Sequence, residues 1–145
     1  MQLNFDKFNF QIKTENNINY IFDVVCRKYI ALTPEEWVRQ HCLHQLIQNG
    51  FAKGRISVER TLPKSKKRYD VVYFDRDGIP QLLVECKAPS VEINDKTLQQ
   101  VTRYIELQES PNILLTNGLN HYLIRRNLEA LEIVQQFPHI SMISE

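Results

Sequence analysis

The stretch that decides the fold spans residues 68–87 and reads RYDVVYFDRDGIPQLLVECK. Residues 68–74 are rich in β-branched and aromatic side chains, which favour a strand. An Asp-Gly pair follows at Asp77 and Gly78, and this pair is a strong signal for the turn of a β-hairpin. The mostly apolar run 79–87 then predicts the returning strand. We therefore expect one hairpin whose loop is residues 75–78.

Three ionisable side chains lie in the arms of this predicted hairpin. A four-residue loop places Asp70 opposite Leu83. Because strand side chains alternate with a period of two, Glu85 and Lys87 then share the face of Leu83 and of Asp70. Three ionisable groups on one sheet face are costly in a core but suit the binding of a metal ion. Charged residues that alternate with apolar ones in a merely half-exposed strand are the alternative interpretation.

The chemistry of these residues indicates a magnesium site. Mg²⁺ prefers oxygen ligands in an octahedron and keeps several waters. Asp70 and Glu85 offer two carboxylates, and the backbone carbonyl of Cys86 lies between the acid and the lysine. Lys87 would either orient a metal-bound water as an ammonium or accept its proton. The reaction class implied is the hydrolysis of a phosphodiester with Mg²⁺, for which Mn²⁺ could substitute.

A helix is predicted between Thr33 and Gly50. Thr33 is a good N-cap, and Glu36 follows three residues later, as in a capping box. Glu35 instead falls within the apolar stripe of the helix, where capping does not explain it. We expect Glu35 to be a third acid near the metal, acting indirectly through a water. Favourable interaction with the helix dipole is the alternative.

A second helix is predicted over residues 94–109, capped by Asn94 or Asp95. Its buried line consists of Leu98, Val101 and Ile105. Gln100 and Tyr104 lie one turn apart beside that line, where an amide and a phenol could hydrogen-bond DNA. A polar helix edge with a half-buried tyrosine is the alternative.

A basic run comes just before Asp70. Its four cationic side chains are Lys64, Lys66, Lys67 and Arg68. A loop of this kind could clamp a DNA backbone near the metal in a salt-dependent way. The alternative is a solvated hairpin loop.

The flanking sequence predicts a mixed sheet covered by helices. Residues 1–32 are expected to be a β-hairpin extension, with arms 7–13 and 18–25, that adds to an edge of the sheet or caps the core. Further strands are predicted over 55–60, 112–116 and 121–125, whereas residues 127–137 fit either a helix or a strand. We therefore predict an α/β (α+β) fold.

Composition places the chain among ordinary globular proteins. It has 145 residues, 43% of them hydrophobic and 24% charged, and a net charge of +1. We expect a single domain over 1–145, with a core over 33–126 and a C-terminal extension over 127–145. An odd cysteine count and the lack of a signal peptide or apolar span predict a reducing, cytoplasmic location without membrane attachment.

In this order and spacing the motifs resemble those of the PD-(D/E)XK nuclease superfamily. They resemble in particular the nuclease domain at the N-terminus of type I restriction enzyme R subunits. The resemblance runs from Thr33 to Gly118 and includes the Glu-Cys-Lys triplet of residues 85–87, the Gln-x-x-x-Tyr element of residues 100–104 and the Thr-Asn-Gly turn of residues 116–118. Tyr69 departs from it, since it stands where the proline of the superfamily's name is expected.

The resemblance implies a restriction-endonuclease-like αβββαβ core and Mg²⁺-dependent cleavage of double-stranded DNA. It implies that Asp70 and Glu85 are metal ligands, that Lys87 is the catalytic lysine, and that Gln100 and Tyr104 have positioning roles. No Gly-x-x-x-x-Gly-Lys-[Ser/Thr] loop occurs, so ATP-driven translocation is not expected of this chain. Restriction-modification subunits are candidate partners, and the oligomeric state is left open. Two alternatives are a non-catalytic module that binds nucleic acid or a subunit, and a junction-resolving nuclease.

Overall fold

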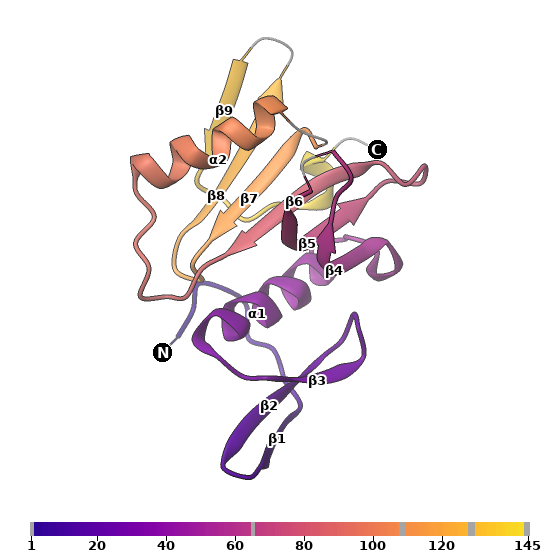
Figure 1. The fold of residues 1–145 in the computed structure, drawn as a ribbon, viewed down its shortest axis with the longest axis vertical. Coiled ribbons are helices and arrows are strands. Elements are labelled where there is room, and N and C mark those ends of the chain that lie inside the picture. The colour runs from indigo at the N-terminus through magenta and orange to yellow at the C-terminus, as the bar shows by residue number, and fades with distance from the viewer. Residues whose placement is uncertain (1, 65, 108–109, 128–129, 144–145) are drawn as a thin grey trace.

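The main sheet of the computed structural model has six strands, in the spatial order β4-β5-β6-β7-β8-β9 (Figure 1). The structure describes residues 2–64, 66–107, 110–127 and 130–143. The strands are β4 (Ile56–Thr61), β5 (Arg68–Phe74), β6 (Pro80–Cys86), β7 (Asn112–Thr116), β8 (His121–Asn127) and β9 (Ala130–Val134). Among the strands of the described residues, only β6 and β7 pair in parallel, and helix α2 (Asp95–Leu107) makes the crossover between them. The predicted mixed sheet is confirmed.

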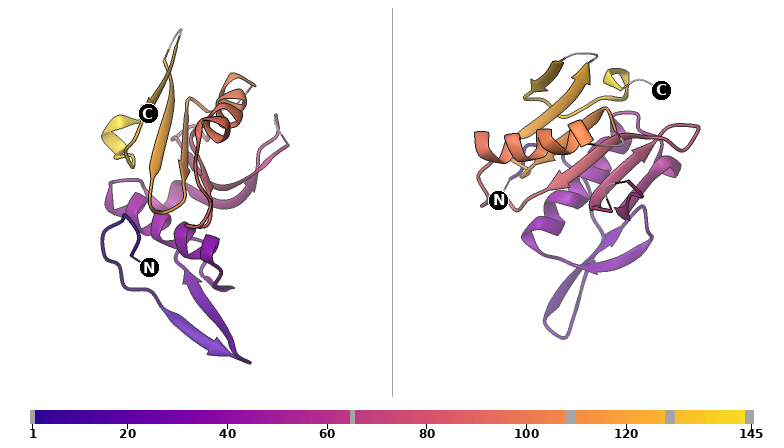
Figure 2. Two further views of the ribbon diagram at one scale, coloured as in Figure 1. Left: turned by 90° about the vertical axis from the view of Figure 1, so that its left-hand side faces the viewer. Right: turned by 45° about the horizontal axis from the view of Figure 1, so that its top comes forward.

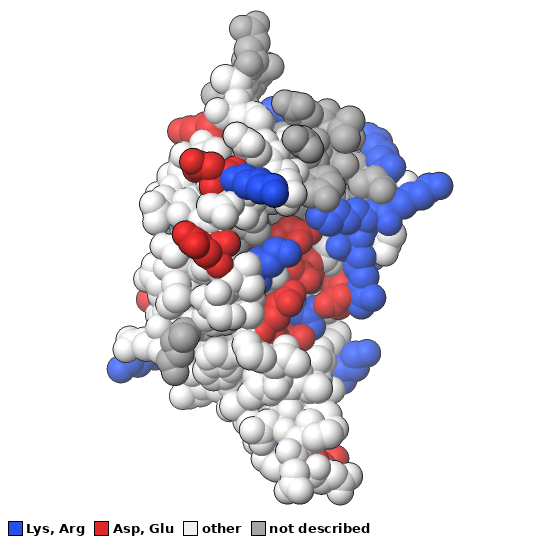
Figure 3. All heavy atoms as spheres, turned by 60° about the vertical axis from the view of Figure 1, so that its left-hand side comes forward, with Lys and Arg blue, Asp and Glu red and all other residues white. Residues whose placement is uncertain are grey.

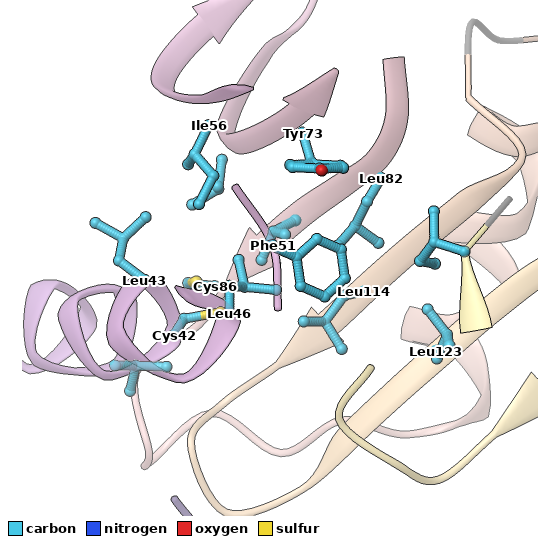
Figure 4. Close-up of a cluster of buried hydrophobic side chains, with 14 of the residues drawn as sticks. Cys42, Leu43, Leu46, Phe51, Ile56, Tyr73, Leu82, Cys86, Leu114 and Leu123 are labelled. Atoms are coloured by element: carbon cyan, nitrogen blue, oxygen red, sulfur yellow. The ribbon is translucent and has the colours of Figure 1, made fainter. Parts of the chain in front are cut away.

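Two helices cover opposite faces of this sheet (Figures 1 and 2). On one face α1 (Pro34–Gln48) packs against alternate residues of the central strands (Figure 4). This cluster includes Val38, Cys42, Leu43 and Leu46 of α1 with Val71, Tyr73, Leu82, Val84 and Cys86. On the other face α2 packs through Leu98 and Val101 against a second cluster that includes Val72, Leu83, Ile113, Leu115 and Ile124. The αβββαβ order is therefore present, followed by β8 and β9.

Helix α1 begins as predicted but without a complete capping box. Thr33 Oγ1 accepts a 3.0 Å hydrogen bond from the backbone N–H of Glu36. The Glu36 carboxylate does not return this bond. It accepts from Arg39 at 2.6 and 2.8 Å and from Gln40 at 2.8 Å instead. Glu36 in the first turn of α1 therefore forms an ion pair with Arg39 in place of a capping bond.

The N-terminal extension contains the predicted hairpin, β1 (Ile12–Glu15) with β2 (Ile18–Asp23), and one further strand, β3 (Lys28–Ala31). Together they form a separate three-stranded antiparallel sheet. This sheet lies beyond α1 and does not extend the main sheet (Figure 2). The prediction missed β3 because Arg27, which turns the chain into it, has an unexpected positive φ of 60°. Buried Asp23 ties the extension to α1 through a 3.0 Å hydrogen bond from Gln40.

The remaining predicted elements fall near their expected places. The uncertain stretch 127–137 contains a strand, β9, which pairs with β8. Asn94 caps α2 by accepting from the backbone N–H of Thr97 at 3.0 Å. Short 3₁₀ helices occur at η1 (Lys53–Arg55) and η2 (Ile140–Met142). The cysteines are free thiols, as predicted. No helix in the described ranges is both long and apolar enough to span a membrane.

The Thr-Asn-Gly turn joins β7 to β8 and brings the N-terminal segment against α1. Gly118 has a φ of +86°, which favours glycine, and its N–H donates to Thr116 Oγ1 at 2.9 Å. A Cβ at this position would lie 3.0 Å from Val38 Cγ2 and 3.1 Å from Leu3 Cδ2. The turn therefore needs glycine both for its backbone conformation and for its close packing.

We expect Gly118→Ala to lower the free energy of unfolding by about 3 kcal/mol, since backbone strain and overpacking add. Gly78→Ala is the matched control, because Gly78 also has a positive φ, +76°, but a Cβ there meets nothing within 4 Å. Its expected cost is about 1 kcal/mol from strain alone. Urea unfolding of both variants measures the difference. Equal costs would show that the close packing at Gly118 is unimportant.

Candidate functional site

Asp70 lies in the central strand β5, opposite the end of β6. Val71 pairs with Val84 in the antiparallel register, and continuing this register by one residue sets Asp70 opposite Glu85. The backbone N–H of Cys86 donates to Asp70 Oδ2 at 2.7 Å. The two predicted carboxylates are thus neighbours across one strand pair.

The predicted hairpin register was wrong by two residues. Leu83 pairs with Val72 rather than Asp70, because the loop is longer than expected and a bulge lies between Tyr73 and Phe74. Pro80 has no N–H to donate, which favours an irregularity at this point. The shift of two residues sets Asp70 opposite Glu85 instead of Leu83.

Strict alternation along β5 is also interrupted at Asp70. Tyr69 packs in the cluster beneath α2 together with Val72, whereas Val71 packs in the cluster beneath α1. The neighbouring strand β4 is irregular at the same level, where Glu59 has a φ of +53° between the pairs that flank it. This local irregularity explains how Asp70 reaches both the Cys86 N–H and a pocket at the start of α1.

The carboxyl group of Asp70 has a pKa raised from 3.8 to about 6. Burial is the largest cause, and the hydrogen bond from the Cys86 N–H acts in the opposite direction. The negative charges of Glu85, Glu35 and Glu59 raise the pKa further, in that order. Repulsion of this kind among carboxylates is what a bound divalent cation relieves.

A small acidic pocket of about 90 Å³ opens beside Asp70. Its lining residues are Thr33, Glu35, Glu36, Arg39, Glu59 and Asp70. Glu35 is exposed and lines this pocket from the first turn of α1, whereas Glu36 is half-buried and bonded to Arg39. Glu36 has the structural role predicted for it, since it is bonded to Arg39. Glu35 is exposed instead of lying in the buried stripe of α1, and its role near a metal stays a prediction. Figure 3 shows acidic side chains gathered at the centre of one face, with lysines and arginines alongside.

Sequence reasoning missed Arg39, the cation that joins two acids of this pocket. Arg39 is only 4% exposed and bonds both Glu36 and Glu59 at 2.6 Å. Glu59 in turn bonds Arg68 at 2.5 Å. The sequence did offer one signal for Arg39. It lies three residues after Glu36, and this helical spacing predicts an ion pair between the two. No local pattern indicates Glu59, whose partners are far away in the sequence.

The basic run divides into two pairs with different surroundings. Lys64 and Lys66 are exposed, as expected of a DNA-facing loop. Lys67 is half-buried, and its ammonium lies 3.0 Å from Glu85 Oε1. Arg68 is bonded to Glu59. Two of the four predicted DNA-binding cations therefore already pair with acids around the candidate metal site.

Lys87 follows β6 directly and is held there by its backbone. Its N–H donates to the carbonyl of Thr116 at 2.8 Å, which ties it to the end of the parallel neighbour β7. The side chain is half-buried. Within the described ranges its ammonium makes no ion pair, so the charge is available to an anion or a water.

The predicted positioning pair on α2 is only partly described. Gln100 is exposed on the helix, as a residue that contacts DNA must be. The side chain of Tyr104 lies outside the part of the chain that the structure describes. The suggested pairing of an amide and a phenol therefore stays a prediction.

The donor set fits a magnesium ion held by few protein ligands. Among the residues that the structure describes, no three His, Cys, Asp or Glu side chains converge closely enough to form a metal cluster. Asp70 and Glu85 supply two hard oxygen donors, and the carbonyl of Cys86 is a candidate third. Mg²⁺ commonly takes one or two carboxylates and completes its octahedron with water and phosphate oxygens. Glu35 is accordingly a candidate for a water-mediated role only.

Comparison with known proteins gives a consistent result. The family model described as "Type I restriction enzyme R protein N terminus" matches residues 34–138, which include α1 and all the candidate site residues. Over 68 residues the chain is 34% identical to the "Type I restriction enzyme EcoAI endonuclease subunit" of Escherichia coli. That segment is 47% of this chain but only 8% of the relative. No solved structure matches the chain.

Proposed function

Because the chain belongs to the family of type I restriction enzyme R protein N termini, we propose that it is a metal-dependent deoxyribonuclease that hydrolyses phosphodiesters of double-stranded DNA. The observation that carries this proposal is the position of Asp70 opposite Glu85, with Glu35 and Glu59 lining the same pocket as Asp70. A purely structural domain has no need for carboxylates that repel one another at a strand end. An ion-binding site needs them, because the bound cation neutralises their charges.

Asp70, Glu85 and the carbonyl of Cys86 would hold the ion. A Mg²⁺ ion in that place supplies a Lewis acid for the phosphate and lowers the pKa of a bound water. Lys87, whose ammonium has no partner in the described ranges, would orient that water and balance charge that develops on the phosphate. Glu35 would hold a second water from the first turn of α1. Lys64 and Lys66 would bind the DNA backbone, and Gln100 would contact it from α2.

Plasmid cleavage tests the proposal. Purified protein with supercoiled plasmid and Mg²⁺ or Mn²⁺ is expected to nick or linearise the DNA, and EDTA is expected to abolish the reaction. We expect Lys87→Met to reduce the rate at least about a hundredfold, because it removes the charge but keeps most of the apolar stem. Lys96→Met, at an exposed position in α2, is the matched control and should keep the wild-type rate. Metal-dependent cleavage that survives Lys87→Met would reject the assigned site.

A second candidate is a DNA-binding module that requires partner subunits for cutting. The Lys67–Glu85 ion pair favours it, because a cation of the protein already occupies one proposed ligand. Restriction-modification subunits are the candidate partners, by analogy with the relative, which is an endonuclease subunit by name. In this case the isolated chain would bind duplex DNA without cleaving it, and cutting would appear only with those subunits.

A further inference from the structure

Glu85 is already engaged by a lysine of the loop that precedes β5. The Lys67 ammonium lies 3.0 Å from Glu85 Oε1, and the two side chains are only 28% and 15% exposed. The ammonium also lies 5.3 Å from the centre of the Tyr69 ring. Because water is largely excluded from this pair, its attraction is stronger than that of an ordinary surface ion pair.

The backbone of the loop holds Lys67 in this inward position. The N–H of Leu62 donates to the Lys67 carbonyl at 3.2 Å, and the N–H of Lys66 donates to the Leu62 carbonyl at 2.9 Å. Lys66 has a φ of +56°, which turns the chain between an exposed lysine and an inward one. One short loop thus presents Lys64 and Lys66 to solvent and Lys67 to the metal site.

A divalent ion and an ammonium compete for the same carboxylate group, because each weakens the attraction of that group for the other. If Glu85 is a metal ligand, an incoming ion has to displace Lys67 or share Glu85 with it. A DNA phosphate beside the site offers Lys67 another anion, next to those bound by Lys64 and Lys66. DNA that draws Lys67 outward therefore leaves Glu85 free to bind the ion.

We propose that Lys67 is an internal counter-ion that keeps Glu85 engaged in the absence of DNA, so that duplex DNA and the divalent ion bind cooperatively. This inference rests on the proposed function, since it takes Glu85 as a metal ligand. Lys67 is a positioning residue in this scheme, because it acts through Glu85. By thermodynamic linkage, DNA tightens ion binding by the same factor by which the ion tightens DNA binding.

The first experiment measures Mn²⁺ binding to DNA-free protein from the electron paramagnetic resonance signal of the free ion. We expect Lys67→Gln to bind Mn²⁺ about tenfold more tightly than wild type, because Glu85 loses its competitor. Lys66→Gln removes the same charge from the same loop at an exposed position, and should change the affinity less than about twofold. Without metal, Lys67→Gln should also unfold at a lower temperature than wild type, whereas saturating Mn²⁺ should reduce the difference.

The second experiment measures the coupling itself. The affinity for a short fluorescent duplex is compared with and without Ca²⁺, chosen because it occupies carboxylate sites without supporting most Mg²⁺ chemistry. Wild type should bind the duplex several-fold more tightly with Ca²⁺, beyond the effect of ionic strength. Lys67→Gln should lose most of this gain, because its ion site no longer depends on release of the lysine.

The outcomes separate this inference from the nuclease proposal. If neither wild type nor Lys67→Gln binds Mn²⁺, the metal site is wrong and both proposals fail. If both bind it with the same affinity, or the variant binds it more weakly, Lys67 does not compete for Glu85 and only the counter-ion role fails. Tighter binding by Lys67→Gln without any DNA cleavage would support the counter-ion role and point to the subunit-dependent alternative.

Discussion

Asp70→Asn should make the metal-free protein more stable at pH 8 while it abolishes metal-dependent cleavage. The expected gain in the free energy of unfolding is on the order of 2 kcal/mol, or about 5 °C in the unfolding temperature. Loss of one of two carboxylate ligands should lower the cleavage rate at least about a hundredfold. An amide still accepts the hydrogen bond from the Cys86 N–H through its oxygen, so the fold keeps this contact.

The gain in stability follows from the raised pKa of Asp70, whose largest cause is burial. The folded carboxyl, with a pKa of about 6, binds its proton more tightly than the unfolded one, whose value is 3.8. The folded state therefore holds more protons between these values, and the free energy of unfolding falls as pH rises through that window. Above pH 6 the full penalty applies, and asparagine removes it. Below the lower value wild type and variant should be about equally stable.

Thermal unfolding in EDTA across pH 3 to 8 measures the effect. Asp77→Asn, an exposed acid in the turn of the same hairpin, is the matched control and should leave the pH profile unchanged. The same pKa predicts that divalent-ion affinity falls about tenfold per pH unit below pH 6, because the ion binds the carboxylate form. A variant that is no more stable than wild type at pH 8 would show that burial of the Asp70 carboxylate does not lower the stability of the folded protein.

The sequence was most informative where the chemistry is local. Thr33 caps α1 and Asn94 caps α2 because each bonds backbone within its own first turn. The hairpin that carries Asp70 and Glu85 was predictable from β propensity and the Asp-Gly pair. The register of this hairpin could not be predicted, because the bulge between Tyr73 and Phe74 depends on the hydrogen bonds that form within the loop. The prediction still put both acids in neighbouring strands of one hairpin, and the shift of two residues sets them opposite each other.

What the sequence could not show depends on contacts between distant segments. Arg39 and Glu59 are separated by 20 positions, yet they form one ion pair inside the acidic pocket. The basic run was interpreted as a DNA clamp, but Lys67 and Arg68 turn toward Glu85 and Glu59. Charge alone cannot distinguish a lysine that faces solvent from one that neutralises a buried acid, because the difference lies in the path of the backbone.

Arg39→Met tests whether the missed cation supports the site. Its guanidinium bonds Glu36 through two nitrogens, at 2.8 and 2.6 Å, and Glu59 through a third at 2.6 Å. Burial lowers its pKa, but the hydrogen bond and charge of Glu36 and the charge of Glu59 raise it overall, so Arg39 stays charged. Methionine fills similar volume without charge and would leave Glu36 half-buried beside Glu59 without its counter-ion.

We expect Arg39→Met to lower the free energy of unfolding by about 3 kcal/mol, as measured by urea denaturation at pH 7. Arg68→Met removes another partner of Glu59, but Arg68 is 65% exposed and its loss should cost less than about 1 kcal/mol. Adding Glu36→Gln to Arg39→Met should restore part of the stability, because it removes the unpaired charge. A cost for Arg39→Met no larger than that of Arg68→Met would mean that solvent, and not Arg39, balances the acids of the pocket. The proposed metal site beside Asp70 would then lack acids that are held in fixed positions.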